Sequence, residues 1–305
     1  MHWKACLISA VLALLPFPAM AELLAAGETA RTLPITLRDG RPMLAAEVAR
    51  RAGVVMLDTG AAYPLMLNRD ALDLPAGPEV ARGPAASGQE IVVIAHPAPA
   101  VTLAGRPFAM PDPALSGDFG FTRDGLGADF LGFLGLPALT GLAFALDQER
   151  LGLTLLRPAP DGALPVPAPE PAEIAADVAF RLTEGGLPGW AGRIGDRPVA
   201  IDIDTGDSGT LYATPDTLAD LTSRGWLTGA PGDRVLSGLE FGGGRFGPFA
   251  VAVVEAGGAA DMRPDPTGDL LRIGASLLDR HPSLWNMPAG RIVFLHPGAA
   301  FLPAR

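Results

Sequence analysis

The sequence contains only one cysteine and one lysine, Cys6 and Lys4, and both lie within its first six residues. The rest of the chain therefore has no thiol and no side-chain primary amine. Their absence excludes disulfides, thiolate metal sites, cysteine nucleophiles and lysine Schiff bases from residues 7–305. Tyrosine is also scarce, with Tyr63 and Tyr212 as its two occurrences.

The first 21 residues have the pattern of an export signal. Lys4 supplies a positive start, residues 5–15 form an apolar run, and Ala19-Met20-Ala21 has the small-x-small form of a cleavage site. The run stops at Pro16, well short of the ~20 residues that a membrane-spanning helix needs. We therefore expect cleavage before Glu22, a periplasmic location and no lasting membrane insertion.

Negative charge predominates. The formal net charge is −10, and loss of Lys4 with the signal would make it −11. Because phosphate backbones are bound by basic surfaces, this balance argues against a nucleic-acid partner.

The chain repeats one pattern on both sides of a proline-rich segment. Residues 157–171 hold six prolines without apolar periodicity, which predicts an extended linker. Three pairs of landmarks share an offset of 139 residues. They are Arg106 and Arg245, Gly135 and Gly274, and Asp147 and Asn286. We expect an N-terminal lobe at 22–156, a linker at 157–174 and a C-terminal lobe at 175–305.

Each half is predicted to be mostly β. Apolar residues alternate from Leu33 to Leu37 and from Val178 to Leu182, the period of a half-buried strand. Further short apolar strands are expected at 91–94, 101–103, 151–155, 250–254 and 291–295. Short helices are expected at 69–74 and 215–224, the second with Thr214 as its N-cap and Pro215 in first position.

Two Asp-Thr-Gly triplets stand at the ends of apolar runs. Asp58-Thr59-Gly60 lies in the first half and Asp204-Thr205-Gly206 in the second, 146 residues later. Two carboxylates at equivalent points can face each other and share one proton, which supplies a general acid and a general base. The glycines allow a tight loop, and the threonine hydroxyls can bond across the lobe interface.

An apolar run, an Asp-Thr-Gly triplet and a later apolar-apolar-Gly segment, present once per half, resemble the aspartic peptidase superfamily. Bacterial retropepsin-like proteins are similar in lobe size, and pepsin is similar in its two-lobed layout. The resemblance implies an all-β fold of two β-barrel lobes with short helices and an active-site cleft between the lobes.

The same resemblance implies an aspartic endopeptidase that hydrolyses polypeptides as a monomer, without metal or organic cofactor. Asp58 and Asp204 would be the catalytic pair, and Thr59, Gly60, Thr205 and Gly206 would support them. Gly135 and Gly274 would lie in strands that pack beside the catalytic loops. A hairpin at 83–88 is expected to serve as the flap over the substrate, with Ser237-Gly238 as its counterpart.

The second triplet departs from the ordinary pattern. Ala61 follows the first triplet, whereas Asp207 follows the second and is a possible modulator of the pair. It would either raise the pKa values of the pair or point to solvent, and we expect the solvent-facing position because turns commonly carry an exposed Asp. Asp202 shares a strand face with Asp204, either as a buried charge or at an edge.

Other enzyme classes fit less well. Gly206-Asp207-Ser208-Gly209 resembles the serine motif of chymotrypsin-like proteases, but the one histidine upstream in the predicted mature chain, His96, lacks the expected neighbours. A calcium loop starting near Asp202 would need a terminal acid where Ala213 stands, and an aspartate-based phosphatase would need a lysine. Two alternatives stay open: a non-catalytic envelope binding protein on the same fold, and a homodimer that uses only the first triplet.

Overall fold

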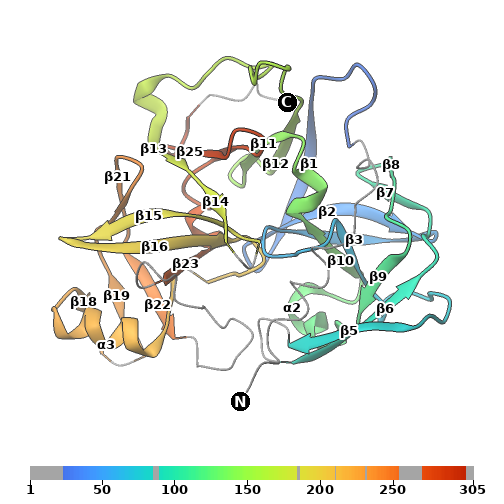
Figure 1. Cartoon of the computed structure of the whole chain (residues 1–305), viewed down its shortest axis with the longest axis horizontal. Coiled ribbons are helices and arrows are strands. Elements are labelled where there is room, and N and C mark those ends of the chain that lie inside the picture. The colour runs from blue at the N-terminus through green and yellow to red at the C-terminus, as the bar shows by residue number, and fades with distance from the viewer. Residues whose placement is uncertain are drawn as a thin grey trace.

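The protein has two β lobes side by side, connected by a sheet to which both contribute (Figure 1). The computed structural model describes residues 23–84, 89–183, 186–209, 211–230, 232–253 and 270–299. The predicted export signal and positions 85–88 of the expected flap lie outside the described residues.

In its described residues, 23–84 and 89–156, the first lobe has twelve strands and short helical turns. Its strands are β1 (Ala30–Arg38), β2 (Arg41–Val48), β3 (Arg51–Asp58), β4 (Leu65–Asn68), β5 (Glu79–Pro84), β6 (Glu90–His96), β7 (Val101–Leu103), β8 (Arg106–Phe108), β9 (Ala114–Gly117), β10 (Phe130–Gly135), β11 (Ala143–Asp147) and β12 (Gly152–Leu156). Its helical turns are η1 (Gly120–Thr122), α2 (Arg123–Leu126) and η2 (Leu136–Leu139).

The second lobe follows the proline-rich segment and has a similar order of elements. It begins with η3 (Pro171–Glu173) and includes α3 (Pro215–Ser223) and η4 (Ala275–Leu277). Its strands are β13 (Ile174–Ala179), β14 (Arg181–Leu182), β15 (Pro188–Ile194), β16 (Arg197–Asp204), β17 (Leu211–Ala213), β18 (Leu227–Thr228), β19 (Val235–Leu236), β20 (Leu239–Phe241), β21 (Gly244–Phe246), β22 (Phe249–Val253), β23 (Leu270–Gly274), β24 (Ser283–Asn286) and β25 (Arg291–Leu295).

Five strands have the same arrangement in both lobes. In the first lobe they run β2-β3-β10-β4-β9, and in the second β15-β16-β23-β17-β22. In each set the second and third strands are parallel, the third and fourth antiparallel, and the fourth and fifth parallel. This agreement confirms the predicted two-lobed, all-β architecture.

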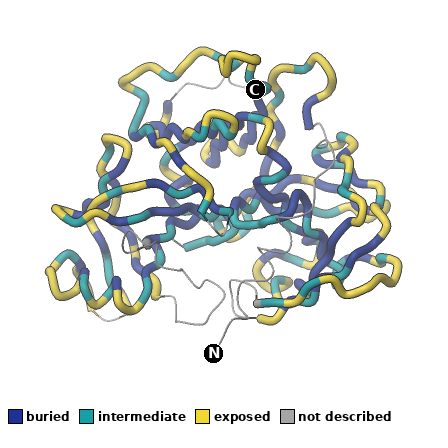
Figure 2. Tube along the Cα trace, viewed as in Figure 1, coloured by how far each residue is buried: buried dark blue, intermediate teal, exposed yellow. Residues whose placement is uncertain are grey.

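The lobes meet in a shared sheet of order β13-β25-β24-β11-β12-β1. At its centre the antiparallel strands β11 and β24 pair, with Ala145 opposite Leu284. These two residues are 139 positions apart, which is the repeat offset of the sequence, so a strand pairs with its own counterpart about a local twofold axis. Every residue of β11 and β12 is buried, and Trp285 of β24 stacks on Phe144 with ring centroids 5.2 Å apart. Figure 2 shows buried segments in this shared sheet and along the strands inside each lobe.

Most predicted elements are present at their expected positions. Strands β7 and β25 match the expected segments, and helix α3 begins at Pro215 with Thr214 Oγ1 accepting a hydrogen bond of 3.2 Å from the Thr217 N–H. The helix expected at 69–74 is wrong, because this stretch forms turns. There the Asn68 side chain accepts a 3.2 Å hydrogen bond from the Asp70 N–H, a local bond that competes with helix formation.

Candidate active site

The two aspartates of the triplets stand at the C-terminal ends of equivalent strands. Asp58 ends β3 and pairs in register with Gly135 of β10, and Asp204 ends β16 and pairs with Gly274 of β23. A Cβ on Gly135 would lie 2.4 Å from the Ala61 carbonyl oxygen, and one on Gly274 would lie 2.2 Å from the Gly209 carbonyl oxygen. Only glycine lets β10 and β23 pass this close to the loops that follow the triplets.

The threonines of the two triplets hold the lobes together through reciprocal hydrogen bonds. The Thr59 N–H donates to Thr205 Oγ1 at 3.0 Å, and the Thr205 N–H donates to Thr59 Oγ1 at 3.0 Å. Each hydroxyl in turn donates to a carbonyl of the opposite lobe, Thr59 to Ile203 at 3.2 Å and Thr205 to Leu57 at 2.8 Å. Because both side chains are buried, these bonds fix the relative position of the two loops.

The two carboxyl groups face each other across this connection. A Cβ on Gly60 would lie 2.6 Å from Asp204 Oδ2, and a Cβ on Gly206 would lie 2.7 Å from Asp58 Cγ. Each carboxyl therefore sits over the glycine of the opposite triplet. Each also accepts a hydrogen bond from its own loop, Asp58 Oδ1 from the Gly60 N–H at 2.8 Å and Asp204 Oδ1 from the Gly206 N–H at 2.9 Å. Both aspartates are half-buried.

Their environment favours one shared proton. Desolvation raises the pKa of Asp58 well above its ordinary value, and the charge of Asp204 and a hydrogen bond between the two carboxyls raise it further. Desolvation also raises the pKa of Asp204, but the positive charge of Arg272 opposes that shift. Two acids in contact cannot both ionise at moderate pH, so the pair holds one proton over a range of pH.

The surroundings of Asp204 contain charges that those of Asp58 do not. Asp202 is buried and accepts two hydrogen bonds from Arg272, from Nε at 3.0 Å and from Nη2 at 2.9 Å. The expectation that Asp207 faces solvent is wrong, because it is half-buried and accepts hydrogen bonds from the Tyr212 hydroxyl and the Gly209 N–H. Its charge raises the pKa of Asp204.

Sequence reasoning did not assign Arg272 to the site. Gly274, two residues later, is a landmark of the repeat and is expected beside the catalytic loops, but this expectation does not extend to Arg272. The usable signal was the offset of 139, which aligns Arg272 with Phe133 and thereby shows a charged residue at an apolar position of the repeat.

His96 and His281 lie in other parts of the fold. His96 is buried, with Nδ1 at 2.6 Å from the Pro75 carbonyl oxygen and Nε2 at 2.7 Å from Ser116 Oγ, so it is not a base for Ser208. His281 Nδ1 lies 2.9 Å from the Leu295 carbonyl oxygen. Within the described ranges, no group of three His, Cys, Asp or Glu side chains is arranged to hold a metal ion.

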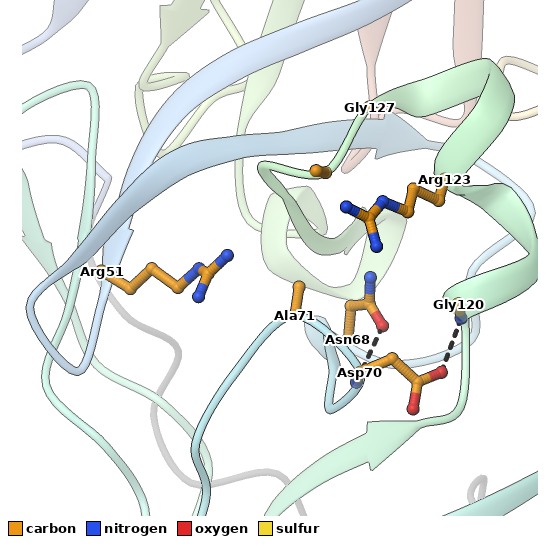
Figure 3. Close-up of a pocket in the computed structure, with 8 residues that line it drawn as sticks. Arg51, Asn68, Asp70, Ala71, Gly120, Arg123 and Gly127 are labelled. Carbon is orange, nitrogen blue, oxygen red and sulfur yellow. Dashed lines mark hydrogen bonds between the residues drawn. The ribbon is translucent and has the colours of Figure 1, made fainter.

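A small pocket of about 100 Å³ lies at the opposite end of β3 from the first triplet. Arg51 and Arg123 face it from two sides (Figure 3). Its other polar groups bond to one another, since Asp70 accepts from the Gly120 N–H at 2.6 Å and the Asp70 N–H donates to Asn68 at 3.2 Å. This pocket is separate from the paired aspartates.

The expected flap region forms a hairpin of β5 and β6, which pair antiparallel. Its tip, at 85–88, lies outside the described residues, so the flap assignment stays a prediction. The two tyrosines are engaged elsewhere: Tyr63 donates a 2.7 Å hydrogen bond to the Pro113 carbonyl oxygen, and Tyr212 donates to Asp207.

Comparison with known proteins identifies the fold but not a family. No protein-family model and no curated protein sequence matches the chain. Among solved structures, the basic 7S globulin from soybean is similar with a TM-score of 0.54 and 12% identity, covering 91% of this chain and 100% of that one. The aspartic proteinase from Irpex lacteus is similar with a TM-score of 0.53 and 14% identity, covering 88% of this chain and 98% of that one. The chain therefore has the two-lobed pepsin-like fold, which a proteinase and a globulin share.

Proposed function

We propose that the protein is an aspartic endopeptidase that hydrolyses peptide bonds with Asp58 and Asp204. The observation that carries this proposal is the facing pair of carboxyls, each packed over the glycine of the opposite triplet and fixed by the reciprocal threonine bonds. The pair forms within one chain, so the homodimer alternative is not needed to complete it. The protein would act as a monomer on polypeptides.

The geometry supplies both partners of an acid-base reaction. The ionised carboxylate takes a proton from a water molecule as the water oxygen attacks the peptide carbonyl, and the protonated carboxyl donates its proton to the carbonyl oxygen. When the tetrahedral intermediate collapses, the proton taken from water passes to the leaving nitrogen, the C–N bond breaks, and one hydroxyl of the intermediate returns a proton to the carboxylate that had donated it, which restores the pair with one proton. The net reaction consumes one water and needs only the two carboxyls, without metal or organic cofactor.

Export to the periplasm is part of this proposal. It is supported by the signal pattern at 1–21 and by the burial of Leu23 and Leu24, which follow Glu22, the first residue after the predicted cleavage site. None of the helices in the described part of the chain has the length and hydropathy of a membrane span.

The test is cleavage of an unfolded polypeptide between about pH 3 and 7, the range in which paired carboxyls titrate. We expect the wild type to cleave and both Asp58→Asn and Asp204→Asn to lose at least about 10³-fold in kcat, because each removes one half of the acid-base pair. Asp216→Asn, an exposed change in the first turn of α3, is the matched control and should retain activity. Cleavage that persists in both pair variants would refute the proposal.

A binding protein on the same fold is the second candidate. It is favoured by the similarity to a globulin and by Asp207, which adds a third carboxylate beside the pair. A peptide whose scissile carbonyl is replaced by a secondary alcohol separates the two, because it mimics the tetrahedral intermediate and is not cleaved. Tight binding of this probe without hydrolysis of any polypeptide would favour the binding protein.

A further inference from the structure

The polar residues behind Asp204 occupy three neighbouring strands. Arg272 of β23 lies opposite Asp202 of β16 on one side and opposite Tyr212 of β17 on the other. In the first lobe, Phe133 of β10 lies between Met56 of β3 and Met66 of β4 in the same pairing pattern. One lobe thus has an apolar row and the other a charged row at the same place in the fold.

The ion pair between Asp202 and Arg272, which forms the charged row, lies inside the protein and not on its surface. The Arg272 side chain is 12% exposed and that of Asp202 is 1% exposed, and the two form a bidentate ion pair. Burying two charges is unfavourable unless their hydrogen bonds compensate, and a pair of apolar residues would hold the strands together as well. The first lobe has apolar residues at the equivalent positions, so the need to pack the strands together does not by itself account for the ion pair.

We propose that the Arg272–Asp202 ion pair makes the catalytic pair asymmetric, so that the shared proton resides on Asp58 while Asp204 is the carboxylate that activates water. This inference rests on the proposed function and assigns the two chemical roles within it. Arg272 is a positioning residue, because it acts on the reaction through Asp204. Asp202 in turn holds the guanidinium of Arg272 in place.

The charges around the pair support this direction. Arg272 pairs in register with Asp202, and Asp204 lies two residues further along β16 on the same strand face as Asp202. The positive charge of Arg272 lowers the pKa of Asp204 against the effect of burial. On the other side, Asp58 faces Asp204, and its pKa is raised by burial and by that neighbour.

Three further groups lie near Asp204. Tyr212 donates its hydroxyl hydrogen to Asp207, and its own pKa is raised by burial and by this carboxylate. Arg41 reaches across from the first lobe, donating from Nε to the Gly206 carbonyl oxygen at 2.8 Å, and it is paired with Asp39 at 2.7 Å. Asp207 works against Arg272, because a negative charge disfavours ionisation of Asp204.

The test replaces the charged row with the apolar residues of the first lobe. In the double variant Asp202→Met/Arg272→Phe, both charges disappear together and no lone charge stays buried, so the fold is expected to survive. Without the cation, Asp204 ionises less readily. The acid limb of the kcat/KM pH profile should move to higher pH by on the order of one unit.

A second variant should move the same limb in the opposite direction. Asp202→Asn keeps an oxygen for Arg272 but removes the opposing negative charge, so Arg272 favours ionised Asp204 more strongly and the limb moves to lower pH. Met56→Leu, at the equivalent position of the first lobe, changes no charge and should leave the limb where it is. A purely structural role of the ion pair predicts no such opposite shifts, and their absence would overturn the inference.

A readout without catalysis separates this inference from the proposed function. The carboxyl carbons of ¹³C-labelled aspartates can be titrated by NMR, with Asp58 and Asp204 assigned from their Asn variants. Asp58 should keep its proton to higher pH than Asp204 in the wild type, and the gap should shrink in the double variant. Loss of the proton from Asp58 first, or an unchanged gap, would refute the inference even if the protein cleaves polypeptides. The expected order in a protein that does not cleave would uphold the asymmetry and reject the peptidase.

Discussion

The two lobes agree in their backbones around the paired aspartates and differ in the side chains directly behind them. Both use a glycine under the opposing carboxyl, a glycine in the neighbouring strand and a threonine bonded across the interface. Behind Asp58 the strands carry Met56 and Phe133, which pack in an apolar cluster. Behind Asp204 they carry an ion pair. The close contacts of the glycines and threonines require the same residues in the two triplet loops. The side chains on the strands directly behind these loops are not constrained in this way and differ in charge between the lobes.

Removing one member of the ion pair should have the largest effect on stability. Arg272→Met leaves Asp202 buried without a partner, and we expect a loss of about 3–5 kcal/mol in the free energy of unfolding. The equivalent change in the first lobe, Phe133→Leu, removes apolar volume only and should cost about 1 kcal/mol. Urea unfolding of both variants measures the difference. Equal losses would mean that the charged row contributes only packing.

The reciprocal threonine bonds should show the symmetry of the two lobes. Thr59→Val and Thr205→Val each remove a hydroxyl without changing the shape of the side chain, and each leaves the buried N–H of the opposite threonine unsatisfied. We expect each variant to lose about 1–3 kcal/mol, with similar values for the two. Thermal unfolding by calorimetry checks this. A large difference between the two variants would show that the hydrogen bonds of one threonine stabilise the lobe interface much more than those of the other.

A smaller, pH-dependent effect should distinguish the two aspartates. The pKa of Asp58 is raised in the folded protein, so the folded state holds the proton of Asp58 more tightly than the unfolded state does. The stability that Asp58 contributes is therefore fully present at low pH. It is lost as pH rises above about 3.9, because the unfolded state ionises first. Asp58→Asn removes that loss and should be more stable than the wild type at pH 7 by on the order of 1 kcal/mol, but close to it at pH 3.

The same measurement on Asp204→Asn provides the comparison. This change leaves Asp58 half-buried, with no cation among the described residues that lowers its pKa, whereas Asp58→Asn leaves Asp204 under the influence of the positive charge of Arg272. At pH 7, Asp204→Asn should therefore increase the free energy of unfolding by less than Asp58→Asn does. A larger gain for Asp204→Asn than for Asp58→Asn would contradict the asymmetry between the lobes.

Local sequence signals predicted the repeat and the triplets well. The apolar run before each Asp-Thr-Gly became a strand that ends at the aspartate, and Gly135 and Gly274 lie beside those strand ends in register. Helix α3 was predictable because its cap and first residue are both specific signals. These features depend on neighbouring residues or on the repeat offset, which one sequence contains.

Non-local contacts were not predictable in the same way. The pairing of β11 with β24 joins residues far apart in sequence, and the uniformly buried side chains of β11 give no alternation that would indicate its partner. The position of Asp207 depends on Tyr212, which lies in the next strand and whose direction no local pattern reveals. The Arg272–Asp202 pair could be inferred only from the register of β16 and β23.

The pairing of Ala145 with Leu284 also bears on what half of this chain would do alone. A lobe separated from its companion would expose the edge of β11, a row of unpaired backbone groups flanked by apolar side chains. Since β24 is its counterpart in the repeat, a second copy of the first lobe would offer the same edge in a compatible orientation. A half-length chain would therefore tend to self-associate through that strand, and the tether between the lobes makes this association intramolecular and independent of protein concentration.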